Sequence, residues 1–290
     1  MKNKQRFIII GIIIAGLLLI VLDISLFKQI PESGSAIGLP MVSDTDGMTL
    51  LYVPAGEFIM GRPYSTEPQE SKTERGRFVI QNENPQHTVM LDAFWIDKTE
   101  VTQEMYAHCV AEGICREPFC ANNAGDNYPV TCISRDDAAD YCIWAGRQLP
   151  TEAQWEKAAR GTDGRTYSWG NEPATCELAV INNGTGMGFC DKDNKVWTVG
   201  SKPDGASPYG ALDMAGNAWE WVADWFGADY YAESPANNPT GPETGQFATV
   251  RGGGMFDYYW YDVRTTTRVL SRVSWRDSNL GFRCAMPADQ

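Results

Sequence analysis

The chain is poor in basic residues. Among its 290 residues, 24 are Lys or Arg and 37 are Asp or Glu, which gives a formal net charge of −13 at pH 7. A surface this acidic repels phosphate backbones, so the composition argues against nucleic acid as a partner. Hydrophobic residues make up 43% of the chain and charged residues 21%, which is typical of a globular protein and not of a disordered one.

The sequence also lacks the common catalytic and zinc-binding motifs. It contains no nucleophile elbow, P-loop or dinucleotide-binding fingerprint. Zinc sites need closely spaced Cys/His pairs such as C-x-x-C, and none occurs. Histidine is present only at positions 87 and 108, so an iron centre built from histidines is not expected. We expect His87 to be a structural residue of a strand and His108 to lie on a helix surface.

The N-terminal segment has the pattern of a membrane anchor. A basic flank over residues 1–6 precedes an apolar run over residues 7–27, which only Asp23 interrupts. A helix of this length extends about 31 Å, enough to cross a bilayer core. The positive flank predicts that residues 1–6 stay in the cytoplasm and that the rest lies outside it, in a single-pass cell-membrane protein. The alternative is a cleaved signal peptide, which would release the domain as a secreted protein.

Eight cysteines agree with an exported domain. An even number of cysteines in an oxidising compartment favours disulfide bonds. We expect Cys176 to pair with Cys190, because the two are close in sequence. Four more cysteines allow three pairings that the sequence cannot separate, and these are Cys109, Cys115, Cys120 and Cys132.

Turn and composition signals set the predicted domain and strand boundaries. Residues 28–47 are interpreted as a flexible linker and residues 48–286 as a single domain. Strands are predicted at 49–53 and 57–61, joined as a hairpin, and at 87–96. The polar stretch 63–84 between them is expected to be a surface loop.

Capping residues at the start of each segment and glycines that end helices predict three helices in the first half of this domain. They are expected at about 99–112, 134–145 and 151–160, with an irregular, disulfide-stapled stretch at 115–130 between the first two. Only short strands and loops follow. This segregation predicts an α+β fold and argues against an alternating α/β sheet.

Six segments, in this order, resemble the formylglycine-generating, sulfatase-modifying-factor family. They are residues 51–61, 98–106, 141–156, 208–221, 250–253 and 279–284, and the most specific stretch is WAGRQLPTEAQW at 144–155. The resemblance covers about residues 48–285. It implies a single loop-rich domain with a C-type-lectin-like fold and a disulfide bond between Cys142 and Cys284.

The resemblance also implies structural calcium, held by backbone carbonyls and carboxylates. The implied ligands are Asp213, the backbone of Gly216 and Ala218, and Glu220. Alternatively, Glu220 only accepts hydrogen bonds from neighbouring backbone. A second family site would use the loop at Asp191, but the asparagine usual upstream falls here on Val180, which counts against that site.

The resembling enzymes oxidise a cysteine of a sulfatase to formylglycine with O₂ and copper(I), a soft ion that needs thiolate ligands. In relatives these ligands follow the Arg-Gly-Gly turn at 251–253. Here Gly254 replaces the expected serine, Met255 follows it, and no cysteine occurs between Cys190 and Cys284. No copper is therefore expected.

An aromatic segment, DYYWYD at 257–262, occupies the substrate-facing position of relatives. Tyrosine and tryptophan are common binding anchors. The binding surface is expected to comprise Tyr258, Trp260, Arg264 and Arg268. The alternative is a strand with half of its aromatic side chains buried.

These observations favour a membrane-anchored, extracytoplasmic binding or accessory protein without oxidase chemistry, whose ligand is a protein segment or a glycan. One alternative is an enzyme of the superfamily, including a formylglycine-generating-type oxidoreductase that acts on sulfatase cysteines. The other is a purely structural member of a cell-envelope assembly.

Overall fold

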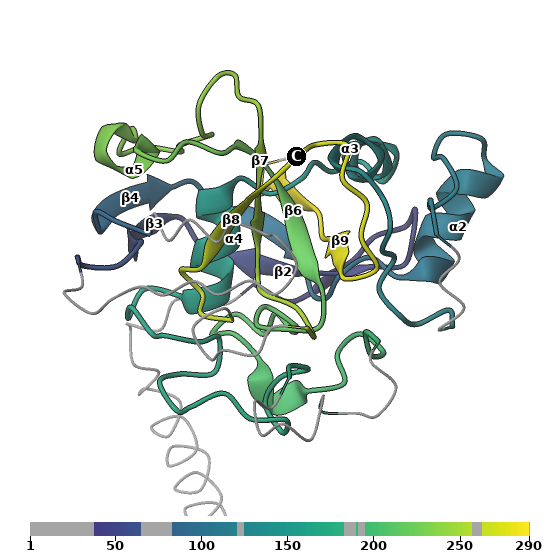
Figure 1. Cartoon of the computed structure of the whole chain (residues 1–290), viewed down its shortest axis with the longest axis horizontal. Helices are drawn as coiled ribbons and strands as arrows, with labels where there is room; N and C mark the ends of the chain where they lie inside the picture. The colour runs from purple at the N-terminus through teal and green to yellow at the C-terminus, as the bar shows by residue number, and fades with distance from the viewer. Residues whose placement is uncertain are drawn as a thin grey trace, which may run out of the picture. The chain divides into compact units, whose positions relative to one another are not determined.

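Two four-stranded sheets and a separate hairpin carry the fold of the residues that the computed structural model describes (Figure 1). These residues are 38–64, 83–120, 125–182, 190, 195–256 and 263–289, and all of them fall within a compact unit spanning 37–290. Within these ranges, no helix is long and apolar enough to cross a membrane. The apolar run 7–27, predicted to be the anchor, lies outside the described residues.

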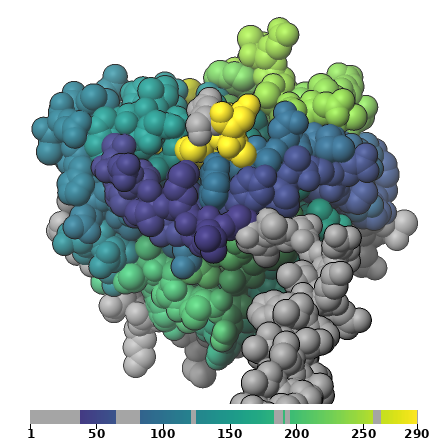
Figure 2. Space-filling model, turned by 180° about the vertical axis from the view of Figure 1, so that it is seen from behind, coloured from purple at the N-terminus to yellow at the C-terminus, as the bar shows by residue number. Residues whose placement is uncertain are grey.

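The first sheet is antiparallel and has the strand order β1-β2-β5-β10. Its strands are β1 (Met41–Val42), β2 (Thr49–Val53), β5 (Phe94–Asp97) and β10 (Ala285–Pro287). The sheet therefore joins both ends of the domain, and Figure 2 shows the purple N-terminal and yellow C-terminal residues on one face of the molecule. The predicted linker 28–47 ends too late, because β1 already pairs with β2 and Asp46 is buried.

The predicted hairpin between residues 49–53 and 57–61 is wrong. Strand β3 (Gly56–Met60) pairs instead with β4 (His87–Leu91), while β2 pairs with β1 and β5. The predicted strand 87–96 is likewise two strands, β4 and β5, which belong to different sheets. The chain turns at Gly56 with a φ of 140°, a conformation that side chains disfavour, and this turn directs β3 away from β2.

The second sheet has the order β8-β7-β6-β9 and combines antiparallel with parallel pairing. Its strands are β6 (Trp219–Trp225), β7 (Ala248–Arg251), β8 (Arg268–Ser271) and β9 (Leu280–Phe282). Most of their residues are buried on both faces of the sheet, including Trp221 and Phe282. The sheet thus forms the centre of the domain, as Figure 1 shows.

The three predicted helices are confirmed. They are α2 (Gln103–Ala111), α3 (Arg135–Trp144) and α4 (Glu152–Arg160), with N-caps at Thr102, Ser134 and Thr151. Capping boxes satisfy the first backbone N–H groups of α3 and α4. A short helix α5 (Tyr230–Glu233) and a 3₁₀ turn η1 (Pro203–Gly205) follow. Helices in the first half and mainly strands in the second give the predicted α+β class.

All eight cysteines form disulfide bonds. The two expected pairs, Cys142–Cys284 and Cys176–Cys190, are confirmed. The other four cysteines pair locally, as Cys109–Cys115 and Cys120–Cys132. These two bonds staple the irregular stretch after α2 at both of its ends.

Candidate functional site

The segment after β7 is the position at which relatives are expected to place their chemistry. Gly252 follows β7 with a φ of 97°, and its backbone carbonyl accepts a hydrogen bond from the Gly216 N–H at 2.9 Å. A Cβ atom at Gly254 would lie only 2.4 Å from Asn279 Nδ2, so the expected serine would require the Asn279 side chain to shift. The backbone N–H of buried Met255 donates to Asn217 O (3.0 Å) and Asn279 Oδ1 (3.2 Å).

No thiol reaches this segment. Each of the eight cysteines is committed to a disulfide, and no cysteine is free. Met255, which follows the turn, contributes only a thioether and is 2% exposed, and residues 257–262 beyond it lie outside the described residues. A thioether carries no charge, so by itself it does not provide the thiolate pair that copper(I) prefers.

The predicted binding surface is partly contradicted. Tyr258 and Trp260 lie outside the described residues. Arg264 and Arg268 are described, and both are buried, with 6% and 0% exposure. They therefore do not form a ligand-facing surface, because buried carboxylates from distant parts of the chain hold them inside.

The pairing of these two arginines explains their burial. Arg268 contacts Glu152 through two hydrogen bonds of 2.7 Å, from Nε and Nη2. Arg264 donates from Nη2 to Glu83 Oε1 at 2.6 Å. Buried arginines need this kind of bidentate or close carboxylate partner to offset the loss of hydration.

A third buried arginine, Arg251, ties α4 to the second sheet. Its Nη2 donates to Glu156 Oε2 at 2.5 Å, and its Nη1 donates to the carbonyls of Thr266 and Thr267 at 2.8 Å each. The stretch between the aromatic segment and β8 is therefore fixed to α4 by charge-assisted hydrogen bonds. The stretch that leads from the aromatic segment into β8 is therefore held firmly in the core.

The predicted calcium residues lie around a second buried group of charges. Glu220 accepts hydrogen bonds of 2.7 Å from Arg283 Nη2, Arg283 Nε and Trp155 Nε1, which rules out the alternative that its partners are neighbouring backbone groups. Asp213, 7% exposed, accepts from the Gly200 N–H at 2.6 Å. Gly216 and Ala218 lie on the loop between these two acids and are buried as well.

A third carboxylate in this group, Glu100, was not identified from the sequence. Its Oε1 accepts a 2.9 Å hydrogen bond from Asn217 Nδ2, and its carboxyl group also hydrogen-bonds to the Asp213 side chain. Burial, together with the charges of Asp213 and Glu220, raises the pKa of Glu100 well above its usual value. Burial likewise raises the pKa of Asp213. Three acids thus lie near the guanidinium of Arg283, and because Glu100 and Asp213 also hydrogen-bond to each other, a proton held between them offsets part of the negative charge.

The second predicted calcium site cannot be placed, because Asp191 lies outside the described residues. Val180, at the position where relatives carry asparagine, is buried, and its carbonyl accepts the Asn217 N–H at 2.8 Å. In the part of the chain that the structure describes, no three His, Cys, Asp or Glu side chains converge to hold a metal ion. Any cation site there would depend on backbone carbonyls.

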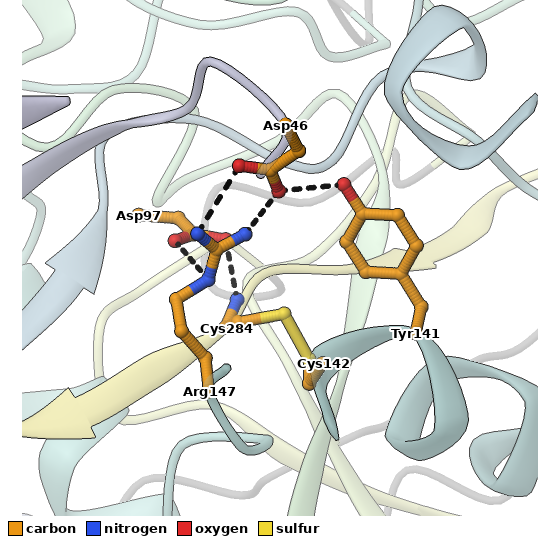
Figure 3. The surroundings of a disulfide bond; sticks show 6 residues. All are labelled: Asp46, Asp97, Tyr141, Cys142, Arg147 and Cys284. Atoms are coloured by element: carbon orange, nitrogen blue, oxygen red, sulfur yellow. Dashed lines mark hydrogen bonds and ion pairs between the residues drawn. A yellow bond between two sulfur atoms is a disulfide. The ribbon is translucent and has the colours of Figure 1, made fainter. Parts of the chain in front are cut away.

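A further buried ion cluster surrounds the Cys142–Cys284 disulfide (Figure 3). Arg147 forms ion pairs with both Asp46 and Asp97. Its Nε lies 3.3 Å from Asp97 Oδ1. The backbone N–H of Cys284 donates to Asp97 Oδ2 at 2.8 Å. Burial raises the pKa of Asp97 to about 7, more than the charge of Arg147 lowers it. Although burial also opposes ionisation of Asp46, hydrogen bonding and charge from Arg147 keep the pKa of Asp46 below its usual value.

The two histidines occupy structural positions. His87 lies in β4, where its Nδ1 is 3.1 Å from Pro85 O and its ring packs edge-on against Tyr231. His108 is exposed on α2. Both placements agree with the expectations from the sequence.

Together, these features define a disulfide-bonded α+β domain whose core is held by buried arginine–carboxylate pairs. The chain belongs to the family of the Sulfatase-modifying factor enzyme 1-like domain, whose profile matches residues 39–288. Over 289 aligned residues it is 33% identical to the formylglycine-generating enzyme of Streptomyces coelicolor, covering 82% of this chain and 88% of that protein.

Two solved structures share the fold. PvdO from Pseudomonas aeruginosa is similar with a TM-score of 0.69 and 24% identity, covering 87% of this chain and 99% of that one. Treponema denticola variable protein 1 is similar with a TM-score of 0.64 and 22% identity, covering 86% and 98%. At these identities the likeness establishes the architecture and not the activity.

Proposed function

We propose that this chain is a membrane-anchored, extracytoplasmic binding or accessory protein of its family, without cysteine-oxidising chemistry. The observation that carries the proposal is the pairing of all eight cysteines in disulfides. Copper(I) chemistry needs thiolate ligands, and this chain has none to offer. Residues 7–27 are the proposed anchor, and the four disulfides are consistent with an oxidising compartment.

The proposed ligand-binding element is the aromatic segment 257–262, with Tyr258 and Trp260 as anchors. The described residues on both sides support this role, because Met255 and Val263 are buried and fixed in the core. A segment held at both ends loses less conformational entropy when it binds. Arg264 takes no part in ligand contact and instead anchors one end to Glu83.

Calcium is proposed as a structural ion of the same domain. The residues that would hold it are Asp213, the backbone of Gly216 and Ala218, and Glu220. The fit is supported by the gathering of the Glu100, Asp213 and Glu220 carboxyl groups near the guanidinium of Arg283. Glu220 Oε1 accepts a hydrogen bond from Arg283 Nη2 and retains a lone pair for a cation. A bound calcium ion would supply charge neutralisation and no redox chemistry.

Binding of the purified full-length protein to glycan and peptide arrays tests the proposed function. Trp260→Ala should lose binding by about tenfold or more while the thermal unfolding curve stays unchanged. Trp275→Ala is the matched control, since Trp275 is 49% exposed and lies outside the aromatic segment. Equal binding by wild type and Trp260→Ala would contradict the proposed surface. The array also decides between a protein segment and a glycan.

The second candidate function is that of a formylglycine-generating-type oxidoreductase acting on sulfatase cysteines. The similarity to the Streptomyces coelicolor enzyme favours it. Incubation with copper(I), O₂ and a sulfatase-type peptide containing cysteine separates the two candidates. The proposed function predicts no aldehyde above a control without enzyme, and aldehyde formation would support the oxidoreductase.

A further inference from the structure

A pocket of about 510 Å³ lies between α2 and the stapled stretch that follows it. In Figure 1 α2 is at the edge of the described unit, away from α5 and the β3–β4 hairpin. The residues that matter for the pocket's chemistry are Gln103, Ala107, Val110, Ala111, Glu117 and Pro118. The lining therefore combines small aliphatic side chains with the polar side chains of Gln103, Glu117 and Thr131. A pocket of this volume accommodates one or two large side chains.

Two disulfides fix the walls of this pocket. Cys109–Cys115 ties the end of α2 to the following stretch, and Cys120–Cys132 ties that stretch to the segment before α3. The Tyr106 hydroxyl donates to Arg116 O at 3.0 Å, and the Phe119 N–H donates to Cys132 O at 3.0 Å. The pocket is thus preformed, which lowers the entropic cost of binding.

Large apolar side chains next to the pocket are exposed to solvent. Phe119, between the lining residues Pro118 and Cys120, is 79% exposed, and Ile114 is 54% exposed. Exposed aromatic and aliphatic side chains beside a concave apolar surface are typical of an interaction site. Phe119 and Ile114 would therefore add to the contact area of a partner that occupies the pocket.

Two polar side chains of the lining, Gln103 and Glu117, indicate which kind of ligand the pocket would favour. Gln103 lines the pocket, and its buried Nε2 has no acceptor among the described residues, so a turn of this side chain toward the pocket would let it donate to a carbonyl of an incoming chain. Glu117 is exposed and supplies a carboxylate at the pocket wall. One amide donor beside an aliphatic lining suits a peptide. A sugar ring would need several hydroxyl partners and an open aromatic face within the pocket, but the lining residue Tyr106 is 1% exposed and the exposed Phe119 lies outside the lining.

The negative charge around the pocket determines which net charge a partner should carry. Residues 103–131 contain four acids and one arginine, with no lysine. The acids Glu104, Glu112, Glu117 and Asp126 are all exposed. A positively charged partner would be attracted to this lobe and a negatively charged one repelled.

From these observations we infer that the pocket binds a short cationic peptide segment of a partner protein, in which basic side chains alternate with aliphatic or aromatic ones. An apolar side chain would enter between Ala107 and Pro118, and its basic neighbour would contact Glu117. The peptide backbone would accept from Gln103. This site is independent of the proposed role of the aromatic segment 257–262.

Fluorescence anisotropy with labelled decapeptides tests the inference on the full-length protein. Alternating Lys/Leu or Arg/Phe peptides should bind, whereas Glu/Leu and Lys/Gly peptides should not. Ala107→Trp, which fills the pocket, should weaken binding by about tenfold or more. Glu117→Lys should weaken it several-fold and reduce its dependence on salt.

Matched controls keep the test specific. Ala232→Trp places the same side chain on an exposed position of α5, and Glu57→Lys makes the same charge change on β3. Both should bind the peptides like wild type. Far-ultraviolet circular dichroism would verify that Ala107→Trp is folded. Ala107→Leu fills the pocket with a smaller side chain and should also weaken binding, to a lesser degree. The inference is overturned if basic apolar peptides bind no better than acidic ones, or if Ala107→Trp binds them like wild type.

Discussion

Buried arginines lie among large aromatic side chains at the centre of this domain. Arg251, Arg268 and Arg283 are completely buried, and each contacts a carboxylate of α4 or β6. Removing one partner of such a pair costs about 3–5 kcal/mol, because the remaining charge stays buried without compensation. The Arg-Gly-Gly and Gly-Phe-Arg motifs are therefore explained mainly by the architecture.

The burial of single residues could not always be predicted from the sequence. Arg264 and Arg268 follow an aromatic segment and were expected on the surface, yet their partners Glu83 and Glu152 lie 181 and 116 residues away. No local pattern reveals such long-range pairs. Glu220 is different, because it lies between Trp219 and Trp221 in the sequence, and a carboxylate in such apolar surroundings needs a partner.

Asp224 provides a test of the electrostatics of single residues. Burial, followed by the charge of Glu152, raises the pKa of Asp224 to about 7 from 3.8. Between these pH values the native state binds more protons than the unfolded state, so the free energy of unfolding falls as the pH rises through this window. Asp224→Asn keeps an acceptor for the Glu152 N–H but cannot ionise. We expect a smaller fall in stability between pH 5 and pH 8.

Urea unfolding at both pH values measures this effect. Some fall should remain in Asp224→Asn, because the pKa of Asp97 is also raised to about 7. The exposed Asp289→Asn serves as the control and should behave like wild type. An unchanged pH dependence in Asp224→Asn would show that Asp224 is already ionised at pH 5 in the native state.

At the scale of elements, the helices were predictable and the strand pairings were not. Helix ends depend on capping residues within three or four positions, such as Ser134 with Asp137, and these are visible in the sequence. Strand partners depend on the whole chain. β2 pairs with β5 and not with the adjacent β3, and β9 pairs in parallel with β6, which lies about 60 residues earlier.

The capping box of α3 is the element-scale test. Ser134 Oγ accepts from the Asp137 N–H at 3.2 Å and donates to Asp137 Oδ2 at 2.5 Å. Ser134→Ala should lower the free energy of unfolding by about 1 kcal/mol, because a buried N–H loses its acceptor. Ser278→Ala, at an exposed position outside any helix, should have little effect. Equal stability of the two variants in denaturant unfolding would mean that the capping box does not stabilise α3.

At the scale of the whole molecule, one α+β domain combines four disulfides with several buried ion clusters. The fold class and two disulfides followed from the sequence and its family resemblance. The pairing of the remaining four cysteines depends on how the chain folds back after α2, which spacing alone does not determine. The cation-binding potential around Glu100 was missed for the same reason, since Glu100 and Asp213 are far apart in sequence.

Calcium dependence is a property of the whole domain. If calcium neutralises the excess charge around Asp213 and Glu220, saturation to about 100 times its Kd would stabilise the native state by about 2.7 kcal/mol. The melting temperature should then rise by several degrees when calcium is added after EGTA treatment. Asp213→Ala should lose this response, whereas Asp163→Ala, an acid paired with Arg165 elsewhere, should keep it. No response in wild type would contradict the calcium proposal.

The absence of a thiol pair is the central claim, and titration with copper(I) tests it most directly. The oxidised full-length protein would compete with a chromophoric copper(I) chelator, and the copper bound per chain would be read from the absorbance. The account predicts no stoichiometric, tight binding, because every cysteine is held in a disulfide. Tight binding of one copper(I) ion per chain, with all four disulfides intact, would contradict it.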